Sequence, residues 1–267
     1  MKVHLFLTIL LASTLFACSP SQGDPAENPE AEAIKGPAPE EDKAVSIIKA
    51  AIAQHGGELY EGSLVEFDFR GRHYTSRREG GQFTYERIFS EENGDNVRDV
   101  LTNEGLTREV NNKQVKLSSK DSSAYSNSVN SVLYFVLLPY FLEDPAVYTS
   151  YLGETTIKGE PYHEIMVTFS EQGGGKDHDD EFVYWFHQSK NTLDYLAYNY
   201  LTDGGGARFR EAHNIRTING IRFADYINYK PPGDARDVQN FDQFFEEGKL
   251  TEVSRIDSEN IKVDNLQ

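Results

Sequence analysis

Short segments with the character of β-strands, separated by turns, run through the second half of the chain and constrain its fold more than any other feature. Their residues are largely aromatic and β-branched, and Gly or Asn stands in most of the links between them. Links of this kind join antiparallel strands that are neighbours in the chain. We therefore expect an antiparallel meander with strands at residues 151–158, 162–171, 181–188, 192–201, 207–217 and 221–229.

The first half of the chain has the same character, with shorter segments. Val65, Phe67 and Phe69 alternate with charged residues, and Gly80-Gly81 marks a hairpin turn. The expected strands here are 64–70, 73–78, 82–89, 97–102, 106–110 and 114–117. The two halves together predict a mainly antiparallel β protein with helices, of the α+β class, whose sheet has about 10–12 strands.

A helix is expected before the first strand. Val45, Ile48 and Ile52 recur at helical spacing and share one face. Gly56-Gly57 follows, and a glycine pair is a common end for a helix.

A second helical segment is inserted in the middle of the chain. It begins with polar residues and becomes wholly apolar over residues 132–142, where Pro139 is expected to kink or end the helix. A membrane-spanning helix needs about 20 apolar residues, so this run is too short to cross a bilayer. A helix that is apolar on every side must instead be buried or cover a cavity.

The central strand of the meander is apolar on both faces. Phe182, Tyr184 and Phe186 share one face, and Val183 and Trp185 share the other. An antiparallel sheet with one wet face would alternate more cleanly between apolar and polar residues. We therefore expect the helices on one face of the sheet, and long aromatic side chains or another layer on the other.

The N-terminus has the features of an export signal. Lys2 precedes an apolar run, and Leu15-Phe16-Ala17-Cys18 resembles the bacterial lipobox, in which the cysteine is acylated. The sequence thus predicts a signal peptide over residues 1–17 and lipidation at Cys18. The alternative is a plain signal peptide followed by an incidental cysteine. Cys18 is the only cysteine, so the fold must be held by its core and not by disulfides.

Composition separates the remaining chain into three parts. Residues 18–42 hold half of the ten prolines together with many acidic residues, which predicts a disordered tether after the lipidated cysteine. Residues 43–235 form the expected domain, and residues 236–267 an expected C-terminal extension that is partly ordered. The formal net charge of −17 argues against nucleic acid and anionic membrane surfaces as partners. Membrane attachment would come from the acyl chains on Cys18.

The order of strands and turns in two successive stretches resembles that of the LolA and LolB lipoprotein-carrier superfamily. The stretches are YLGETTIKGEPYHEIMVTF and FVYWFHQSKNTLDYLAYNY. A closer resemblance is to an uncharacterised family of Bacteroidota outer-membrane lipoproteins, for which no activity is known. It is carried by the stretches GGGKDHDDEFVYWF, GGGARFREAHN and NGIRFADYINY. That closer resemblance covers most of residues 43–235. The carrier resemblance implies a curved half-barrel, helices packed in its concave face, and an apolar cavity that can hold acyl chains.

Ten residues would line such a cavity. They come from the apolar run and from the central strand: Leu133, Phe135, Val136, Leu137, Tyr140, Phe141, Phe182, Tyr184, Trp185 and Phe186. Two interpretations of the run 132–142 stay open. It seals an ordinary core, or it forms a lid whose displacement exposes a lipid site.

The acidic segment 177–181 is the other candidate site. The meander places its loop at the same end of the sheet as the second GGG loop, so the acids are expected near Arg208 and Arg210, most simply in ion pairs. The metal candidates are Asp177, His178, Asp179 and Asp180. The spacing suggests a weak Ca²⁺ site, although Phe182 stands where a calcium loop needs Gly. The alternative is a solvated turn.

Catalytic motifs are missing from the sequence. It contains no Gly-x-Ser-x-Gly, His-Glu-x-x-His or phosphate-loop pattern, and His163 and His187 are expected as sheet residues. We therefore expect a non-enzymatic protein without a cofactor, anchored by lipid in the outer membrane and facing the periplasm. Its expected function is binding of a hydrophobic ligand or acyl chain. The alternatives are an envelope protein–protein interaction module and a metal-binding or metal-assisted enzyme that uses the acidic loop.

Overall fold

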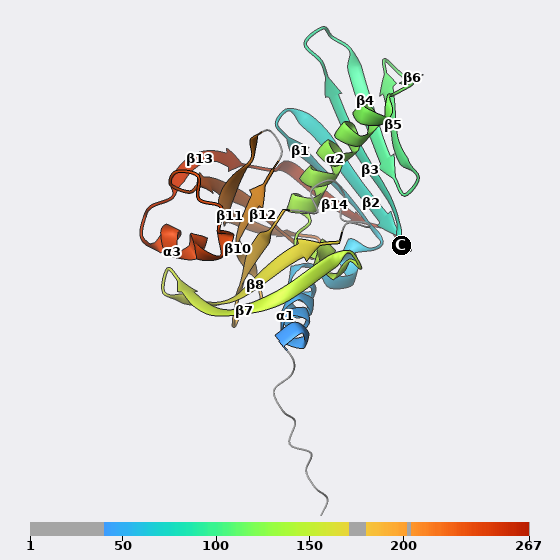
Figure 1. Cartoon of the computed structure of the whole chain (residues 1–267). Helices are drawn as coiled ribbons and strands as arrows, with labels where there is room; N and C mark the ends of the chain where they lie inside the picture. The colour runs from blue at the N-terminus through green and yellow to red at the C-terminus, as the bar shows by residue number, and fades with distance from the viewer. Residues whose placement is uncertain (1–39, 171–179, 202–203, 267) are drawn as a thin grey trace, which may run out of the picture. The chain divides into compact units, whose positions relative to one another are not determined.

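The computed structural model describes residues 40–170, 180–201 and 204–266, which lie in the unit Ala38–Gln267 (Figure 1). The helical elements in these ranges are α1 (Glu40–His55), η1 (Gly57–Tyr60), α2 (Ser119–Val136), η2 (Tyr140–Glu143), η5 (Val238–Asn240) and α3 (Phe241–Glu246). Within the described part, none of the helices has the length and apolar character needed to span a membrane.

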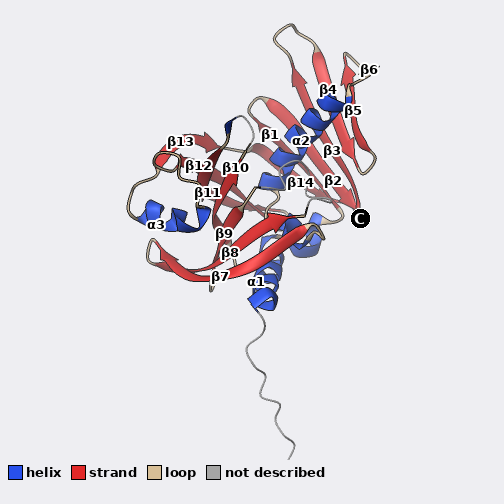
Figure 2. Ribbon diagram, in the orientation of Figure 1, coloured by secondary structure: helices blue, strands red, loops and turns tan. Residues whose placement is uncertain are grey.

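The strands form two antiparallel sheets of seven strands each (Figure 2). The first has the order β14-β1-β2-β3-β4-β5-β6, and the second β13-β12-β11-β10-β9-β8-β7. The bounds in the first sheet are β1 (Ser63–Phe69), β2 (Arg72–Glu79), β3 (Gln82–Ser90), β4 (Asn96–Thr102), β5 (Gly105–Val110), β6 (Lys113–Val115) and β14 (Glu259–Asn265). Those in the second are β7 (Val147–Ile157), β8 (Glu160–Phe169), β9 (Phe182–His187), β10 (Leu193–Tyr200), β11 (Gly206–Ile218), β12 (Ile221–Lys230) and β13 (Thr251–Ile256).

The mainly antiparallel β class with packed helices is confirmed. Each of the twelve segments expected from the turn pattern is a strand, and β13 and β14 are added to them. The two sheets do not close into a barrel, because β6 and β7 are free edges of different sheets.

The C-terminal segment supplies an edge strand to each sheet. β13 pairs with β12, and β14 pairs with β1 in a register that sets Ser63 opposite Asn265. The short link between β13 and β14 is held at Ser258, whose backbone N–H donates to Asp225 Oδ1 at 2.9 Å. Arg216 Nη2 donates to the Ser258 carbonyl at 2.6 Å and to Asp225 Oδ1 at 2.9 Å. Residues 251–265, within the expected extension, thus complete both sheets.

Two apolar clusters fill the inner side of the sheets. One lies between α1 and the second sheet, and the other between α2 and the first sheet, where α2 crosses β3, β4 and β5 (Figure 1). Ala44, Ile48, Ala51 and Ile52 are the buried face of α1, whereas Val45 is 37% exposed. The helix ends at His55, directly before the glycine pair, as expected.

A third cluster covers the opposite face of the second sheet. Val183 and Trp185 of β9 pack there with Phe209 of β11 and with Val238 and Phe241 of the C-terminal helical segment. Both faces of this sheet are therefore covered, which agrees with its apolar sequence on both sides. All three clusters are built from residues between Ala44 and Val263. Residues 40–266 thus contain a complete core and are expected to fold without the residues before them.

Candidate ligand-binding site

The apolar run 132–142 divides its side chains between the two inner clusters. Leu138 and Leu142 are buried in the cluster of the second sheet, and Leu133, Leu137 and Phe141 in the cluster of the first. The run therefore lies between the inner faces of both sheets and contacts each of them. The helix itself ends at Val136, before Pro139, and η2 carries the chain onward.

Nine of the ten predicted cavity residues lie on this inner side. Phe182, Tyr184 and Phe186 are buried, with Phe135 partly buried against them. The other five belong to the cluster of the first sheet: Leu133, Val136, Leu137, Tyr140 and Phe141. Trp185 lies on the outer face, because successive residues of a strand point to opposite faces. The structure thus separates Trp185 from the rest of the predicted lining.

Tyr134, which the sequence analysis did not select, joins the two clusters. Its ring stacks on Phe141 at 5.5 Å between centroids and meets Phe182 edge-on at 6.4 Å. Its hydroxyl forms a hydrogen bond of 2.9 Å with the hydroxyl of Tyr184. Burial raises the pKa of both tyrosines well above the usual range, so both hydroxyls stay protonated.

Arg210 of β11 also points into this interior. Its side chain lies against Phe135 of α2, with 3.9 Å between the guanidinium carbon and the ring centroid, and the residue is only 8% exposed. Nη2 donates to the hydroxyl of Tyr198 at 2.7 Å, whereas Nε is buried without a hydrogen-bond partner. Among the described ion pairs none involves Arg210. The described contacts of its guanidinium group are with the rings of Phe135 and Tyr198 and with the Tyr198 hydroxyl, and Asn228 stands opposite it on β12.

The sequence analysis expected Arg208 and Arg210 near the acids of residues 177–181, most simply in ion pairs, and most of these acids lie outside the described residues. In the structure, Arg208 Nη1 donates to the Ala207 carbonyl at 2.7 Å, and Arg210 turns inward. Arg210 stands opposite Leu196, a residue of the apolar inner face, and this strand register is seen only in the structure.

Most of the acidic loop itself lies outside the described residues, including Asp177, His178 and Asp179. Asp180 is buried directly before β9. Glu181 receives a hydrogen bond of 2.9 Å from Asn199 Nδ2. The described residues hold no group of three or more metal-ligating side chains.

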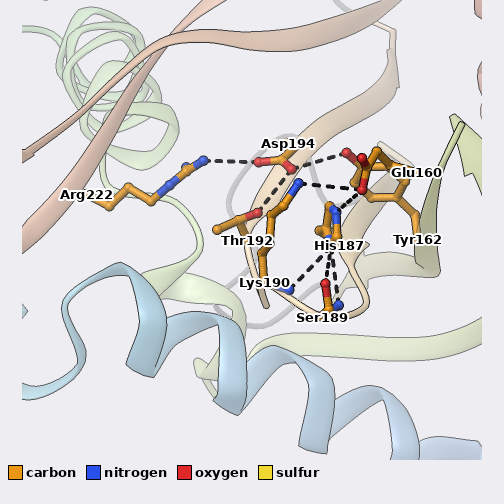
Figure 3. Close-up of polar contacts among 8 residues, drawn as sticks. All are labelled: Glu160, Tyr162, His187, Ser189, Lys190, Thr192, Asp194 and Arg222. Atoms are coloured by element: carbon orange, nitrogen blue, oxygen red, sulfur yellow. Dashed lines mark hydrogen bonds and ion pairs between the residues drawn. The ribbon is translucent and has the colours of Figure 1, made fainter. Parts of the chain in front are cut away.

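A second polar cluster lies at the β9–β10 turn (Figure 3). His187 Nδ1 accepts hydrogen bonds from the backbone N–H groups of Ser189 at 3.2 Å and Lys190 at 3.3 Å. Nε2 must then carry the proton, which it donates to Glu160 Oε2 at 2.8 Å. Both ring nitrogens are engaged, so His187 is a strand residue that fixes the turn, as expected, and has no free nitrogen for base catalysis.

Asp194 accepts hydrogen bonds from the other three side chains of this cluster. Its Oδ1 accepts from Arg222 Nη2 at 3.0 Å, and its Oδ2 accepts from Thr192 Oγ1 at 3.0 Å and Tyr162 OH at 3.2 Å (Figure 3). These bonds tie β8, β10 and β12 together. The arginine here has a carboxylate partner, in contrast to Arg210.

A third polar group is buried between the first sheet and α2. Arg87, Asp99 and Arg108 stand directly opposite one another on β3, β4 and β5. Asp99 is fully buried, and its carboxylate accepts from Arg87 Nη2 at 2.6 Å and from Arg108 Nε at 2.6 Å. Two buried arginines thus share one acid.

The polar half of α2 is attached to this group. Arg87 Nη1 donates to Ser128 Oγ at 2.7 Å, and the guanidinium carbon of Arg108 lies 3.4 Å from the ring centroid of Tyr125. Both contacts are directional, because a hydrogen bond and a cation–π contact each require a fixed geometry. They fix the first half of the helix on the first sheet.

The apolar run 132–142, which follows the polar half of α2, is also held to the first sheet by polar contacts. Arg78 of β2 donates from Nε to the hydroxyl of Tyr140 at 3.2 Å, and that hydroxyl also contacts Glu61. Toward the second sheet, the described hydrogen bond of the segment is the one between Tyr134 and Tyr184. The segment is therefore attached by polar contacts on one side and mainly by apolar contacts on the other.

Comparison with solved structures gives matches of low sequence identity. A LolA superfamily protein from Nitrosomonas europaea is 12% identical with a TM-score of 0.47, and the match covers 84% of this chain and 94% of that chain. A DUF1329 family protein from Desulfovibrio piger is 13% identical with a TM-score of 0.40, covering 83% and 93%. Lipoprotein LppX from Mycobacterium tuberculosis is 11% identical with a TM-score of 0.29, covering 62% and 91%.

Comparison with curated proteins found no match. A family model, in contrast, matches residues 43–258, which include α2, both inner clusters apart from their C-terminal strand β14, and Arg210. The match spans most of the chain, and the protein therefore belongs to the family of unknown function DUF6503.

Proposed function

We propose that this protein binds a hydrophobic ligand or acyl chain between the segment 132–142 and the inner face of the second sheet. The observation that carries the proposal is the unequal attachment of that segment. On the side of the first sheet, Arg78 holds Tyr140 of the segment, and Arg87 and Arg108 hold the preceding part of α2 at Ser128 and Tyr125. The contacts of the segment with the second sheet are mainly apolar, with one hydrogen bond of Tyr134 and the cation–π contact of Phe135 with Arg210 as the directional ones.

Apolar contacts are not directional, so an acyl chain can replace one apolar surface with another at a small cost in free energy. The polar contacts with the first sheet stay intact during such an exchange. The aromatic rings of Phe182, Tyr184 and Tyr198 would then line the ligand on the sheet side. Phe135 and Tyr134 would line it on the helix side.

Binding can be tested on the chain expressed from residue 19 onward. Native mass spectrometry is expected to show copurified lipid, and the delipidated protein should bind a fluorescent fatty acid saturably. Hydrogen exchange should change on binding in residues 132–142 and in β9. Residues 238–246 on the outer face serve as the internal control and should keep their exchange rates. Equal changes on both faces, or no saturable binding, would contradict the proposal.

The location of the protein is part of the same proposal. A signal peptide over residues 1–17, lipidation at Cys18 and a tether to residue 42 would hold the domain at the outer membrane on its periplasmic side. In a bacterial host with lipoprotein processing, mass spectrometry of the mature chain should find diacylglycerol and an amide-linked acyl group on Cys18. Cys18→Ser should release the protein from the membrane fraction, and a chain that stays membrane-bound after this change would refute the anchor.

A further inference from the structure

Arg210 is an exception among the buried arginines of the described residues. An arginine keeps its positive charge at every physiological pH, and burying an unpaired charge costs several kcal/mol. Arg87 and Arg108 avoid this cost by sharing Asp99, whose carboxylate lies 2.6 Å from each of them. Among the described residues Arg210 has no such partner, and its Nε lacks even a hydrogen bond. The described part of the interior thus holds a buried positive charge without a counter-charge of its own.

The edge of the Arg210 guanidinium group carries an N–H donor that has no hydrogen-bond partner among the described residues. Phe135 covers the flat face of the guanidinium group at 3.9 Å, and the ring centroid of Tyr198 lies 5.0 Å from its carbon. A guanidinium group binds carboxylate or phosphate oxygens through the N–H groups on its edge, in the plane of the group. The buried Nε–H is one of these donors and is unused.

Tyrosine hydroxyl groups of the same interior can add hydrogen bonds to an anion bound at Arg210. The hydroxyl of Tyr198 already lies 2.7 Å from Arg210 Nη2, and Tyr226 is buried in the same apolar cluster of the second sheet. Burial raises the pKa of Tyr226 to about 12, so its hydroxyl stays protonated at neutral pH. Protonated hydroxyls donate hydrogen bonds to an anion without adding a competing negative charge.

We propose that Arg210 is the subsite for the anionic head of an amphiphilic ligand, whose carboxylate or phosphate oxygens supply the missing counter-charge. This inference rests on the proposed binding of an apolar chain and adds the chemistry of the head. The ring of Phe135 joins the two parts of the ligand site, because it covers Arg210 and belongs to the segment that would face the chain. The head is thus the buried end of the ligand.

The test compares three ligands that share one apolar chain: dodecanoate, dodecyl phosphate and dodecanol. Their affinities for the chain from residue 19 onward can be measured by displacement of a neutral fluorescent apolar probe. A hydrogen bond to a charged group contributes about 1.5–3 kcal/mol, so at least one anion should bind about 10- to 150-fold more tightly than the alcohol. The tighter of the two anions identifies the head group.

Arg210→Met and Arg210→Gln should remove this preference, since both anions then lose their counter-charge whereas dodecanol has no charge to lose. Arg208→Gln is the matched control, because Arg208 lies two residues away on the same strand and face, and it should keep the preference. Without ligand, Arg210→Met should melt no lower than the native chain, since it removes a buried unpaired charge.

The outcomes separate the two proposals. Equal affinity of the native chain for all three ligands would refute the anion subsite and leave binding of the apolar chain in place. A preference that survives in Arg210→Met, or that is lost equally in Arg208→Gln, would also refute the subsite. No binding of dodecanol or of either anion would overturn the proposed function itself.

Discussion

Replacing Asp99 with Asn should lower the free energy of unfolding by about 3–5 kcal/mol, because it leaves two buried arginines without a counter-charge. Asp99 has no exposed surface, and its two oxygens accept four hydrogen bonds from Arg87 and Arg108. Asparagine keeps the shape of the side chain but supplies only one acceptor oxygen and no charge. The loss can be measured by urea unfolding of the chain from residue 19 onward.

Glu86→Gln is the matched control. Glu86 pairs with Arg98 at 2.6 Å across the same two strands, but the side chain of Arg98 is 41% exposed. Exposed ion pairs contribute about 0–1 kcal/mol, so this change should cost little. If Asp99→Asn costs no more than Glu86→Gln, the Arg87–Asp99–Arg108 row does not stabilise the fold as argued.

Local features of the sequence predict most of the strands. Glycine and asparagine turns and the alternation of side chains are properties of neighbouring residues, and they locate β1 to β12 to within a few residues. The division into two sheets is a long-range property. The pairing of β14 with β1 is another, since it sets Ser63 against Asn265, 202 residues later in the chain. No local signal in Glu259–Asn265 distinguishes this pairing from a free end.

The same distinction applies to the candidate site. The apolar inner face of β9 was predicted, because the alternation of Phe182, Tyr184 and Phe186 is local. The inward position of Arg210 was not predicted, because its burial depends on Phe135, which lies on a helix far away in the sequence. Charge alone suggested an ion pair with the acidic loop. The register of β11 with Leu196 was the information that sequence reasoning lacked.

The stability of the protein should also depend on pH through His55, at the C-terminal end of α1. The residue is 3% exposed, and its Nε2 accepts a hydrogen bond of 3.1 Å from the backbone N–H of Leu193. Burial, with the charge of Arg222, lowers the pKa of His55 from 6.5 to about 3. The folded state therefore keeps this imidazole neutral, whereas the unfolded chain protonates it near pH 6.5.

The sign of the effect follows from proton linkage. The contribution of His55 to stability is fully present above pH 6.5 and is lost as the pH falls from 6.5 toward 3, because the unfolded state binds the extra proton. At pH 4.5 the loss should be about 2–3 kcal/mol, since each pKa unit corresponds to about 1.4 kcal/mol. Urea unfolding at a series of pH values measures it directly.

Glu164 acts in the opposite direction over part of the same range. Burial, with the charge of Asp242, raises the pKa of Glu164 from 4.5 to about 7. Its contribution is present below pH 4.5 and is lost as the pH rises through 7, so it partly masks the effect of His55. Two variants separate the two groups, each measured against the native chain. For His55→Gln, the free energy of unfolding of the native chain minus that of the variant should fall by up to about 1.4 kcal/mol per pH unit as the pH is lowered from 6.5 to 4.5. For Glu164→Gln the same difference should rise as the pH is lowered. A His55→Gln difference curve that is flat over this range would show that the imidazole is protonated equally in the folded and unfolded states.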